Sequence, residues 1–428
     1  MNGSPPLPGS QVRNGDERVP RPVRPPGGFP VVGIIGGGQL ARMCQPPAVN
    51  LSVTLSVLSE TSDASAALVV PHAPVGAHDD LDRVRAFAAG CDVVTFDHEH
   101  VPANVLAALE SDGVTLHPSP RALVYAQDKL AMRRRLTQIG VHCPRWAQVR
   151  TAAELAAFAE GSPGGQPAWP VVLKTVRGGY DGKGIRVVDS ADAALDWFEL
   201  VDAQAGAPEG EHAPFRDGLL AEELVAFTRE LAVLVARSPS GQAVAWPVVE
   251  TVQTDGICTS VVAPAPDLPL GLAGEAVEAG LRIAGELGVT GVLAVEMFEV
   301  HDPSGDPTYL VNELAMRPHN SGHWTIDGAV TSQFEQHLRA VLDLPLGEPT
   351  ARAPWTVMVN VLGGEHNELY SAYRHVLARD PALKVHLYGK GVRPGRKIGH
   401  VTVYGEDLAG LSERAGHAAD YLAGVIDE

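Results

Sequence analysis

Short apolar runs recur along the chain, each bounded by glycine, proline or polar residues. Unbroken runs predict buried strands, and a run that alternates with polar residues predicts a half-buried strand. The strands predicted in this way are residues 31–35, 51–57, 92–96, 114–116, 171–175, 185–188, 219–225, 291–298 and 309–311. Helices are expected at residues 119–139, with Ser119 as the N-terminal cap, and at residues 273–287 and 332–342. Strands interleaved with helices are typical of an α/β fold, here with α+β character where strands follow one another directly.

Two of these strands, residues 291–298 and 309–311, flank a strong turn signal at residues 302–307. A hairpin centred on residues 304–305 sets Glu296 opposite Glu313, with Cβ atoms roughly 5 Å apart. Two bare carboxylates at that separation repel by about 3 kcal/mol at an effective dielectric near 20. The pair therefore predicts a bound cation, and the alternative is two solvated surface glutamates. Glu299 is expected on the opposite strand face without a partner.

The stretch after this hairpin is unusually rich in polar chemistry. Asn312 adds an amide oxygen to the two carboxylates, a donor set that suits Mg²⁺ and, with it, phosphates. Arg317, His319 and Asn320 follow within a few residues. Pro318 stops regular structure there, so these groups are expected on a loop at a strand end, where ligands collect in α/β proteins.

A glycine-rich loop at residues 178–184 separates the strands expected at residues 171–175 and 185–188. It lacks the Walker pattern, but Lys174 and Lys183 add positive charge, and glycine lets the backbone approach a ligand closely. The loop predicts a flexible lid over phosphates; the alternative is an ordinary glycine-rich turn.

The first strand runs into GGGQLA at residues 36–41, which matches G-x-G-x-x-A and opens a helix whose free N–H groups can accept a phosphate. Glu60 follows the next strand near where a dinucleotide fold keeps its ribose-binding acid, so a nicotinamide-dependent oxidoreductase is an alternative. Residues 46–47 are both proline and are expected to shorten or kink the helix. Residues 97–100 read DHEH, and the histidine pair can serve a metal or hydrogen bonds.

The net charge of the 428-residue chain is −18, which argues against binding a nucleic-acid backbone and means that anions must be captured locally. Residues 388–400 carry four basic side chains around a Pro-Gly turn and predict a phosphate clamp. Residues 1–28, rich in proline, are expected to be a disordered tail. There is no apolar run of about 18 residues and no signal-like core, and the four cysteines are widely spaced. A cytoplasmic protein without a membrane span is expected.

Taken together, the motifs resemble the ATP-grasp superfamily, and the match is close to the family of N5-carboxyaminoimidazole ribonucleotide synthetases, ATP-dependent carboxylases of purine biosynthesis. The resemblance covers about residues 30–425 and rests on GGYDGKG at 178–184, NELAMRPHNSGH at 312–323 and RPGRKIGH at 393–400. The chain departs from the family at Met316, where proline is usual, at Asp97, where glutamate is usual, and at the two prolines of residues 46–47.

The resemblance implies three domains after the tail: a Rossmann-like pre-ATP-grasp domain at 29–120, an ATP-grasp domain at 121–346 with a lid at 145–228, and a small β-rich domain at 347–428. It implies that ATP, bicarbonate and 5-aminoimidazole ribonucleotide react to give the carbamate, ADP and phosphate, through carboxyphosphate, in a homodimer. Implied nucleotide contacts are Lys129, Lys174, Gly179, Tyr180, Asp181, Gly182, Lys183, Gly184, Glu222, Glu223, Leu224, Val225, Glu230, Gln253, Asn312 and Glu313.

Glu296 and Glu313 are implied ligands of Mg²⁺, with Mn²⁺ as a substitute. Implied ribonucleotide contacts are Gly38, Gln39, Leu40, Asp97, Glu99, Lys390, Arg393, Arg396 and Lys397, and implied catalytic residues are Tyr180, Asp181, Arg317, His319 and Asn320. Besides the oxidoreductase, the alternatives are another ATP-grasp ligase, such as a formate-dependent glycinamide ribonucleotide transformylase, and a non-catalytic nucleotide sensor. The oxidoreductase leaves Glu296, Glu313 and the glycine loop unexplained.

Overall fold

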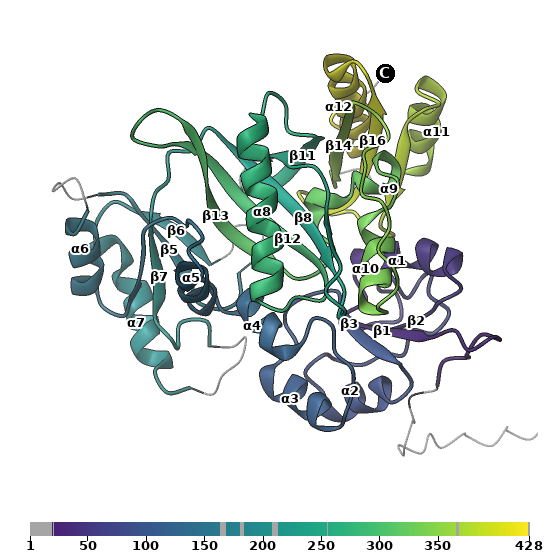
Figure 1. The fold of residues 1–428 in the computed structure, drawn as a ribbon, viewed down its shortest axis with the longest axis horizontal. Coiled ribbons are helices and arrows are strands. Elements are labelled where there is room, and N and C mark those ends of the chain that lie inside the picture. Colours follow the sequence, from purple (N-terminus) through teal and green to yellow (C-terminus); the bar gives the residue numbers. More distant parts are fainter. Residues whose placement is uncertain are drawn as a thin grey trace, which may run out of the picture.

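The computed structural model describes residue 19 and residues 21–162, 168–179, 184–207, 213–254, 256–364 and 368–426. The expected contacts Tyr180, Asp181, Gly182 and Lys183 lie outside this described part. The N-terminal elements lie below the large central sheet, and a smaller sheet lies to one side (Figure 1). This mixed architecture confirms the predicted fold class.

The N-terminal unit is a parallel sheet in the order β2-β1-β3, formed by β1 (Val31–Ile35), β2 (Thr54–Leu58) and β3 (Val93–Phe96). Its helices are α1 (Gln39–Asn50), α2 (Leu81–Ala88) and α3 (Ala103–Ser111). All five residues of β1 are buried, as its continuous apolar run predicts. The short strand expected at residues 114–116 is reduced to a single bridge between Leu116 and Val94.

One local expectation for this unit is corrected: α1 is not cut short at Pro46 and Pro47 but continues to Asn50. Most of the expected tail, residues 1–18 and residue 20, lies outside the described residues. Within the described part of it, Arg24 forms a two-pronged ion pair with Asp92 at 2.7 and 3.0 Å. Because Asp92 also accepts the Val31 N–H, this pair joins the chain before the first strand to the sheet.

The single helix expected at residues 119–139 is in fact two, α4 (Pro120–Gln127) and α5 (Lys129–Gln138). Ser119 caps the first of them, as predicted, by accepting the Ala122 N–H. Asp128 interrupts the run with extended backbone angles and caps the second helix by accepting the Ala131 N–H at 2.8 Å. The break makes Lys129 the first residue of α5.

A four-stranded antiparallel sheet in the order β4-β7-β5-β6 lies to one side. It contains β4 (Trp146–Val149), β5 (Val171–Thr175), β6 (Ile185–Val188) and β7 (Leu219–Glu223), with α6 (Ala152–Glu160), a 3₁₀ turn η1 (Asp192–Ala194) and α7 (Leu195–Gln204). The glycine loop joins β5 to β6, so the strands expected on either side of it are confirmed.

The large sheet has nine strands in the order β13-β12-β8-β10-β11-β14-β16-β15, with β9 paired to β8. Its strands are β8 (Arg229–Arg237), β9 (Ala243–Ala245), β10 (Val249–Thr254), β11 (Ile257–Ala263), β12 (Gly291–His301), β13 (Pro307–Ala315), β14 (Trp355–Leu362), β15 (Lys384–Leu387) and β16 (Lys397–Gly405). Because β11 pairs with β14, the sheet runs unbroken across the boundary expected near residue 346.

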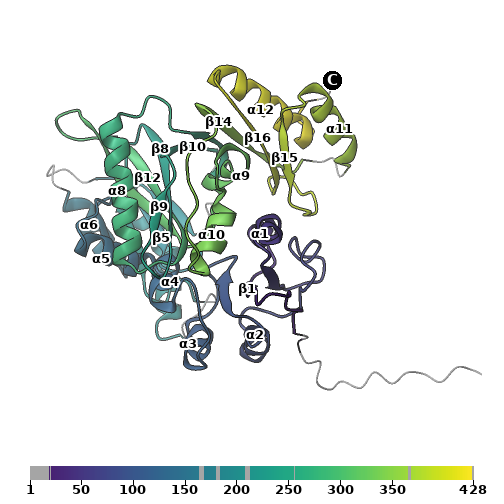
Figure 2. The same ribbon diagram turned by 45° about the vertical axis from the view of Figure 1, so that its right-hand side comes forward.

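Helices cover this sheet and connect it to the N-terminal unit. They are α8 (Leu270–Glu286), the 3₁₀ turn η2 (Asn320–Gly322), α9 (Thr325–Gly328), α10 (Gln333–Val341), α11 (Tyr370–Arg379) and α12 (Leu408–Ala423). Apolar residues of α10, such as Phe334 and Leu338, share one core with β1, β2 and α1. Figure 2 shows β15 above α1, so the C-terminal strands lie over the first helix of the N-terminal unit. Among the described residues, no helix is long and apolar enough to cross a membrane.

Candidate functional site

The hairpin of β12 and β13 sets Glu296 opposite Glu313, as predicted, but a β-bulge is needed to do so. For the pairs between the bulge and the turn, such as Met297 with Val311, the residue midway between the two partners in the sequence is Ser304. Carried inward unchanged, that register would set Glu296 opposite Asn312. The bulge between Glu296 and Met297 adds one residue to β13 and so brings Glu313 across from Glu296.

The two carboxylates are not bare, which corrects the expected repulsion. Glu296, with a side chain 25% exposed, lies 3.0 Å from Nε2 of His319. Burial raises the pKa of Glu296, but the hydrogen bond and charge of His319, aided by Arg317 and Lys397, outweigh burial and lower it. Glu313 is 42% exposed and lies 3.9 Å from the Lys129 ammonium. Glu296 therefore already has an imidazole partner and Glu313 an ammonium neighbour.

Glu299, expected to lack a partner, is buried and paired with Arg229 at 2.6 Å. Arg229 also holds Glu250 at 2.9 Å. Glu299 is thus part of a structural ion-pair cluster and cannot serve as a neutral control for Glu296.

A buried arginine that sequence reasoning missed holds the bulge in place. Arg133 of α5 is fully buried, and its Nε donates to Glu222 at 2.5 Å. Its other nitrogens donate to the backbone oxygens of Val311 and Asn312, at 3.1 and 2.7 Å. The available signal was the i, i+3, i+6 spacing of Leu130, Arg133 and Leu136, which puts the arginine on the apolar face of its helix.

Lys174 of β5 completes this network. Its ammonium lies 2.8 Å from the Glu222 carboxylate and 3.1 Å from the Asn312 amide oxygen. Burial raises the pKa of Glu222, but Arg133 and Lys174 together lower it below its usual value. The Glu222 side chain is therefore committed to these two cations, and only its backbone is left for an adenine edge.

Lys129 ties the start of α5 to the base of the glycine loop. Its backbone N–H donates to the Val176 oxygen at 3.0 Å and its ammonium donates to the Gly178 oxygen at 2.9 Å. Gly178, Gly179 and Gly184 have φ of +67°, +80° and +70°, angles that side chains other than glycine rarely adopt. The expected Lys129 therefore lies near Glu313 and at the entry to the loop that carries Gly179.

The segment after β7 forms another wall, with Glu223, Leu224 and Val225 lining the cavity. Glu223 is fixed by the Arg145 N–H at 2.9 Å. Phe227, which sequence reasoning did not single out, stacks on Phe298 of β12 with ring centroids 4.7 Å apart and planes within 11°. Both rings line the same cavity and offer an apolar face for a flat ring.

Glu230, at the start of β8, has an unusually high pKa for a carboxyl group. Burial, followed by the charge of Glu296, raises its pKa to about 7, against a smaller lowering by a hydrogen bond from Gln253. Gln253 of β10 lines the cavity beside it. The pKa of Glu230 thus lies close to neutral pH, as the perturbed pKa values of groups at ligand sites often do.

The helix terminus expected to bind a phosphate is partly occupied by the protein itself. Asp97 accepts the N–H of Gly38 at 2.7 Å and that of Ala41 at 2.8 Å, so its carboxylate caps α1. Burial raises the pKa of Asp97, although these two bonds act the other way. An added Cβ on Gly38 would lie 2.0 Å from the Asp97 carboxylate, so only glycine fits there. Gln39 and Leu40, the residues between the two bonds, line the cavity.

Residues of the polar loop meet acids and amides from distant elements. Arg317 forms an ion pair with Glu99 at 2.8 Å. His319 is fixed through both ring nitrogens, by Glu296 and by Ser321 Oγ at 2.9 Å. Asn320 exchanges two amide hydrogen bonds, of 3.0 and 2.8 Å, with Asn360 of β14. The loop is therefore rigidly placed between the two carboxylates of the hairpin and the N-terminal sheet.

The basic C-terminal turn, at residues 388–400, packs against the N-terminal unit. Lys390 donates to the Gln39 side chain, and Ser65 donates to the Tyr388 oxygen at 2.6 Å, so the turn docks on the N-terminal unit. Arg396 donates to the Gly391 oxygen at 3.1 Å.

These groups surround one cavity of about 1000 Å³. Of the expected contacts that the structure describes, the cavity is lined by Gln39, Leu40, Asp97, Glu99, Lys129, Lys174, Gly179, Glu222, Glu223, Leu224, Val225, Glu230, Gln253, Glu296, Asn312, Glu313, Arg317, His319, Asn320, Lys390, Arg396 and Lys397. Gly38, Gly184 and Arg393 stand outside that lining. Glu296 lies close enough to Glu230 and to Lys397 for their charges to interact, so acidic and basic lining groups both lie near the hairpin carboxylates.

Three family models match the chain. They are the ribonucleotide synthetase preATP-grasp domain at residues 30–127, the ATP-grasp domain at 134–334 and the phosphoribosylaminoimidazole carboxylase C-terminal domain at 356–414. A curated N5-carboxyaminoimidazole ribonucleotide synthase from Mycobacterium tuberculosis is 52% identical over 397 residues, covering 92% of this chain and 88% of that protein. One from Synechococcus elongatus is 41% identical over 92% of this chain and 94% of its own length.

Solved structures agree with these relatives. The Aspergillus clavatus carboxyaminoimidazole ribonucleotide synthase complexed with ATP has a TM-score of 0.79 and 32% identity, over 93% of this chain and 99% of that one. The A. clavatus enzyme in complex with ADP and 5-aminoimidazole ribonucleotide has a TM-score of 0.78 and 31% identity, over 92% and 98%.

Proposed function

Because this chain belongs to the family of N5-carboxyaminoimidazole ribonucleotide synthases, an ATP-dependent ligase family of purine biosynthesis, we propose how its own residues divide the work. The observation that supports the proposal is the cavity: residues 222–225, Glu230, the hairpin glutamates Glu296 and Glu313, and the basic residues Lys390, Arg396 and Lys397 all line it. An oxidoreductase does not fit, because Asp97 occupies two of the N–H groups that a dinucleotide pyrophosphate needs.

ATP is proposed to lie between the two sheets. The backbone of residues 222–225 faces the adenine edge, and Phe227 and Phe298 offer it an apolar surface. Glu230 and Gln253 are placed for the ribose hydroxyls. Lys129 and Lys174, with Gly179 and Gly184 at the ends of the glycine loop, are proposed phosphate contacts. Asn312 keeps Lys174 in position through its amide oxygen.

The hairpin carboxylates fit a hard cation. Glu296 and Glu313 face each other across the strands and, with Asn312, supply only oxygen donors, which Mg²⁺ and Mn²⁺ prefer. The Lys129 ammonium stays 3.9 Å from Glu313, so that carboxylate keeps room for another partner. A bound Mg²⁺ supplies neutralisation of phosphate charge.

The ribonucleotide is proposed to occupy the opposite end. Lys390, Arg396 and Lys397 are proposed to hold its 5′-phosphate, since guanidinium and ammonium groups are the strong phosphate donors. Gln39 and Leu40, beside the Asp97 cap at Gly38, line the place where its ribose would lie. Glu99 is proposed to act by orienting Arg317. Arg393, outside the cavity lining, is proposed as the weakest member of the clamp.

Bicarbonate is the proposed third substrate, and its site is proposed at Arg317, His319 and Asn320, between the two larger substrates. A bicarbonate oxygen attacks the γ-phosphorus of ATP, giving carboxyphosphate and ADP. The exocyclic amine of 5-aminoimidazole ribonucleotide then takes the carboxyl group, releasing phosphate and a proton. Arg317 offers a fixed positive charge to the anionic intermediate, and the fixed His319 and Asn320 offer preorganised polar groups.

The decisive experiment measures ADP release with 5-aminoimidazole ribonucleotide, with and without added bicarbonate in degassed buffer. We expect turnover to require both. A matched reaction offers formate and glycinamide ribonucleotide instead and should release no ADP above background. ADP release that depends on formate, or that ignores bicarbonate, would overturn the assignment.

The assembly and compartment are also proposals. We propose a homodimer, as the family resemblance suggests, and light scattering should then give about twice the chain mass of 45.1 kDa. The four cysteines are free thiols, which supports the proposed cytoplasmic compartment.

A further inference from the structure

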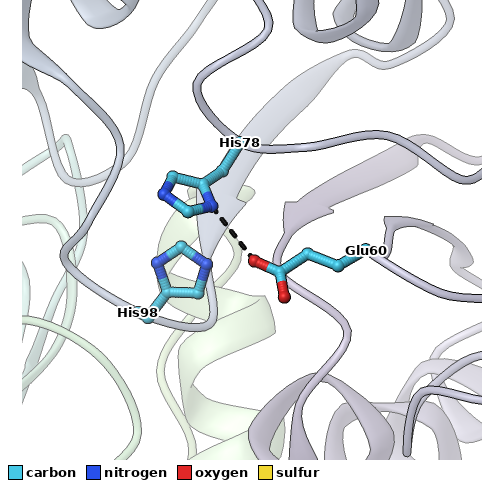
Figure 3. A group of neighbouring side chains, drawn as sticks. All are labelled: Glu60, His78 and His98. Atoms are coloured by element: carbon cyan, nitrogen blue, oxygen red, sulfur yellow. Dashed lines mark hydrogen bonds and ion pairs between the residues drawn. The ribbon is translucent and has the colours of Figure 1, made fainter.

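Three side chains gather at the carboxyl edge of the N-terminal sheet (Figure 3). Glu60 follows β2, His98 follows β3, and His78 lies on the connection before α2. Nδ1 of His78 lies 3.2 Å from the Glu60 carboxylate. One donor atom from each of the three residues can be chosen so that all lie within 4.8 Å of one another. The mechanism proposed above uses none of these three side chains.

The histidines are arranged to offer lone pairs. The rings of His78 and His98 meet edge to face with centroids 4.8 Å apart. Burial, reinforced by His78 and His100, lowers the pKa of His98 to about 3, so its ring is neutral at physiological pH. Neutral imidazole is the form that binds metals. An added Cβ on Gly36 would lie 2.8 Å from the His98 ring, so the ring rests against the backbone of the first glycine turn.

We propose that Glu60, His78 and His98 bind a divalent cation of the zinc class, such as Zn²⁺ or Co²⁺. Two imidazoles and one carboxylate form a set that zinc accepts with a fourth position open to water. Imidazole nitrogen is a poor ligand for Mg²⁺, so this site and the all-oxygen hairpin site select different metals. The inference does not rest on the proposed function.

Binding requires a defined rearrangement of protons. Nδ1 of His98 accepts the His100 N–H at 3.1 Å, so the ring proton of neutral His98 is on Nε2. For Nε2 to bind the metal, that proton must leave or move to Nδ1, and the bond from His100 must break if it moves. The donors must also draw together from 4.8 Å, since zinc–nitrogen bonds are about 2.0–2.1 Å long. The His100 amide is therefore a local reporter of binding.

His98 also lines the large cavity, whereas Glu60 is exposed. The next residue, Glu99, pairs with Arg317. A cation at this cluster would fasten residues 97–100, which carry both the Asp97 cap and that ion pair, to the loop that bears His78.

The test titrates Co²⁺ into chelator-treated full-length protein with excess Mg²⁺ present to fill oxygen-only sites, and follows visible absorption. We expect one equivalent to bind with the intense bands of a four-coordinate site and to be displaced by Zn²⁺. Glu60→Gln, whose side chain is exposed, should weaken binding at least tenfold without changing the melting temperature of the metal-free protein. His78→Ala and His98→Ala should abolish the bands.

His301→Ala is the matched control, because His301 is an exposed histidine on the hairpin outside the cluster. It should bind Co²⁺ as the unaltered protein does. Absence of a stoichiometric band, or equal binding by Glu60→Gln and the unaltered protein, overturns the site. A loss caused equally by His301→Ala and by His98→Ala overturns it as well. Because no nucleotide or ribonucleotide is present, failure here leaves the proposed ligase activity standing.

Discussion

Removal of the Arg133 guanidinium tests whether one buried cation holds the bulge that pairs Glu296 with Glu313. In Arg133→Met, Glu222 keeps Lys174 at 2.8 Å but loses its closest partner, and the oxygens of Val311 and Asn312 lose their donors. Breaking a buried ion pair from one side costs about 3–5 kcal/mol. Because Lys174 remains, we expect the lower end, about 3 kcal/mol.

That cost should be visible as a fall in melting temperature. About 2–4 °C is lost per kcal/mol in a domain of this size, so the fall should be roughly 6–12 °C. Turnover should fall more steeply than stability, because a displacement of about 1 Å in a positioned group can cost about 100-fold in rate. The assay pairs thermal melts with steady-state ADP release at saturating ATP.

Arg135→Met is the matched control on the same helix. Arg135 is 30% exposed and pairs with Glu286 at the surface, where such pairs contribute about 0–1 kcal/mol. Its melting temperature should stay within about 4 °C of the unaltered protein. If Arg133→Met melts no lower than Arg135→Met and turns over normally, the bulge is held by β-sheet pairing alone and the reasoning is wrong.

Three further predictions follow from the cavity. Glu313→Gln should lose the stabilisation by Mg-ATP in thermal melts and most turnover, whereas the exposed Glu275→Gln should behave as the unaltered protein; normal turnover by Glu313→Gln would exclude the metal role. Arg396→Ala should raise the KM for the ribonucleotide at least tenfold and leave that for ATP unchanged, with a smaller effect from Arg393→Ala, and equal effects on both substrates would move the clamp elsewhere. ATP should bind more tightly as pH rises through about 7, because Glu230 then becomes the better acceptor for ribose hydroxyls, and Glu230→Gln should flatten that profile in a nucleotide titration.

The raised pKa of Glu230 also makes the stability of the folded protein depend on pH in a predictable direction. Between its usual range and about 7 the folded protein holds a proton that the unfolded chain has released. Stability therefore falls as pH rises through this window, and Glu230→Gln should remove that part of the slope. Ionisation of Glu230 as pH rises is therefore expected to strengthen nucleotide binding and to lower the stability of the fold.

The sequence by itself determined the features that depend on near neighbours. Apolar runs predicted the strands of the N-terminal sheet, β5, β6 and β7 of the smaller sheet, and only β12 and β13 of the large sheet. Ser119 indicated a helix start, and the turn at residues 302–307 indicated the hairpin. Motifs with set spacing identified the family, and most of the expected contacts that the structure describes line the cavity. These succeed because periodicity, capping and turn chemistry are local, acting over a few residues.

Only the tertiary structure decided which polar groups meet. Asp97 caps a helix 56 residues earlier in the chain, and Arg133 reaches the Asn312 oxygen across 179 residues. The bulge at β13, the partner of Glu299 and the meeting of Glu60, His78 and His98 are of the same kind. A buried charge must find a partner wherever the packed chain brings one, because an unpaired charge in the interior is costly. Which partner the charge finds depends on the residues that surround it in the folded structure, and spacing along the sequence does not reveal them.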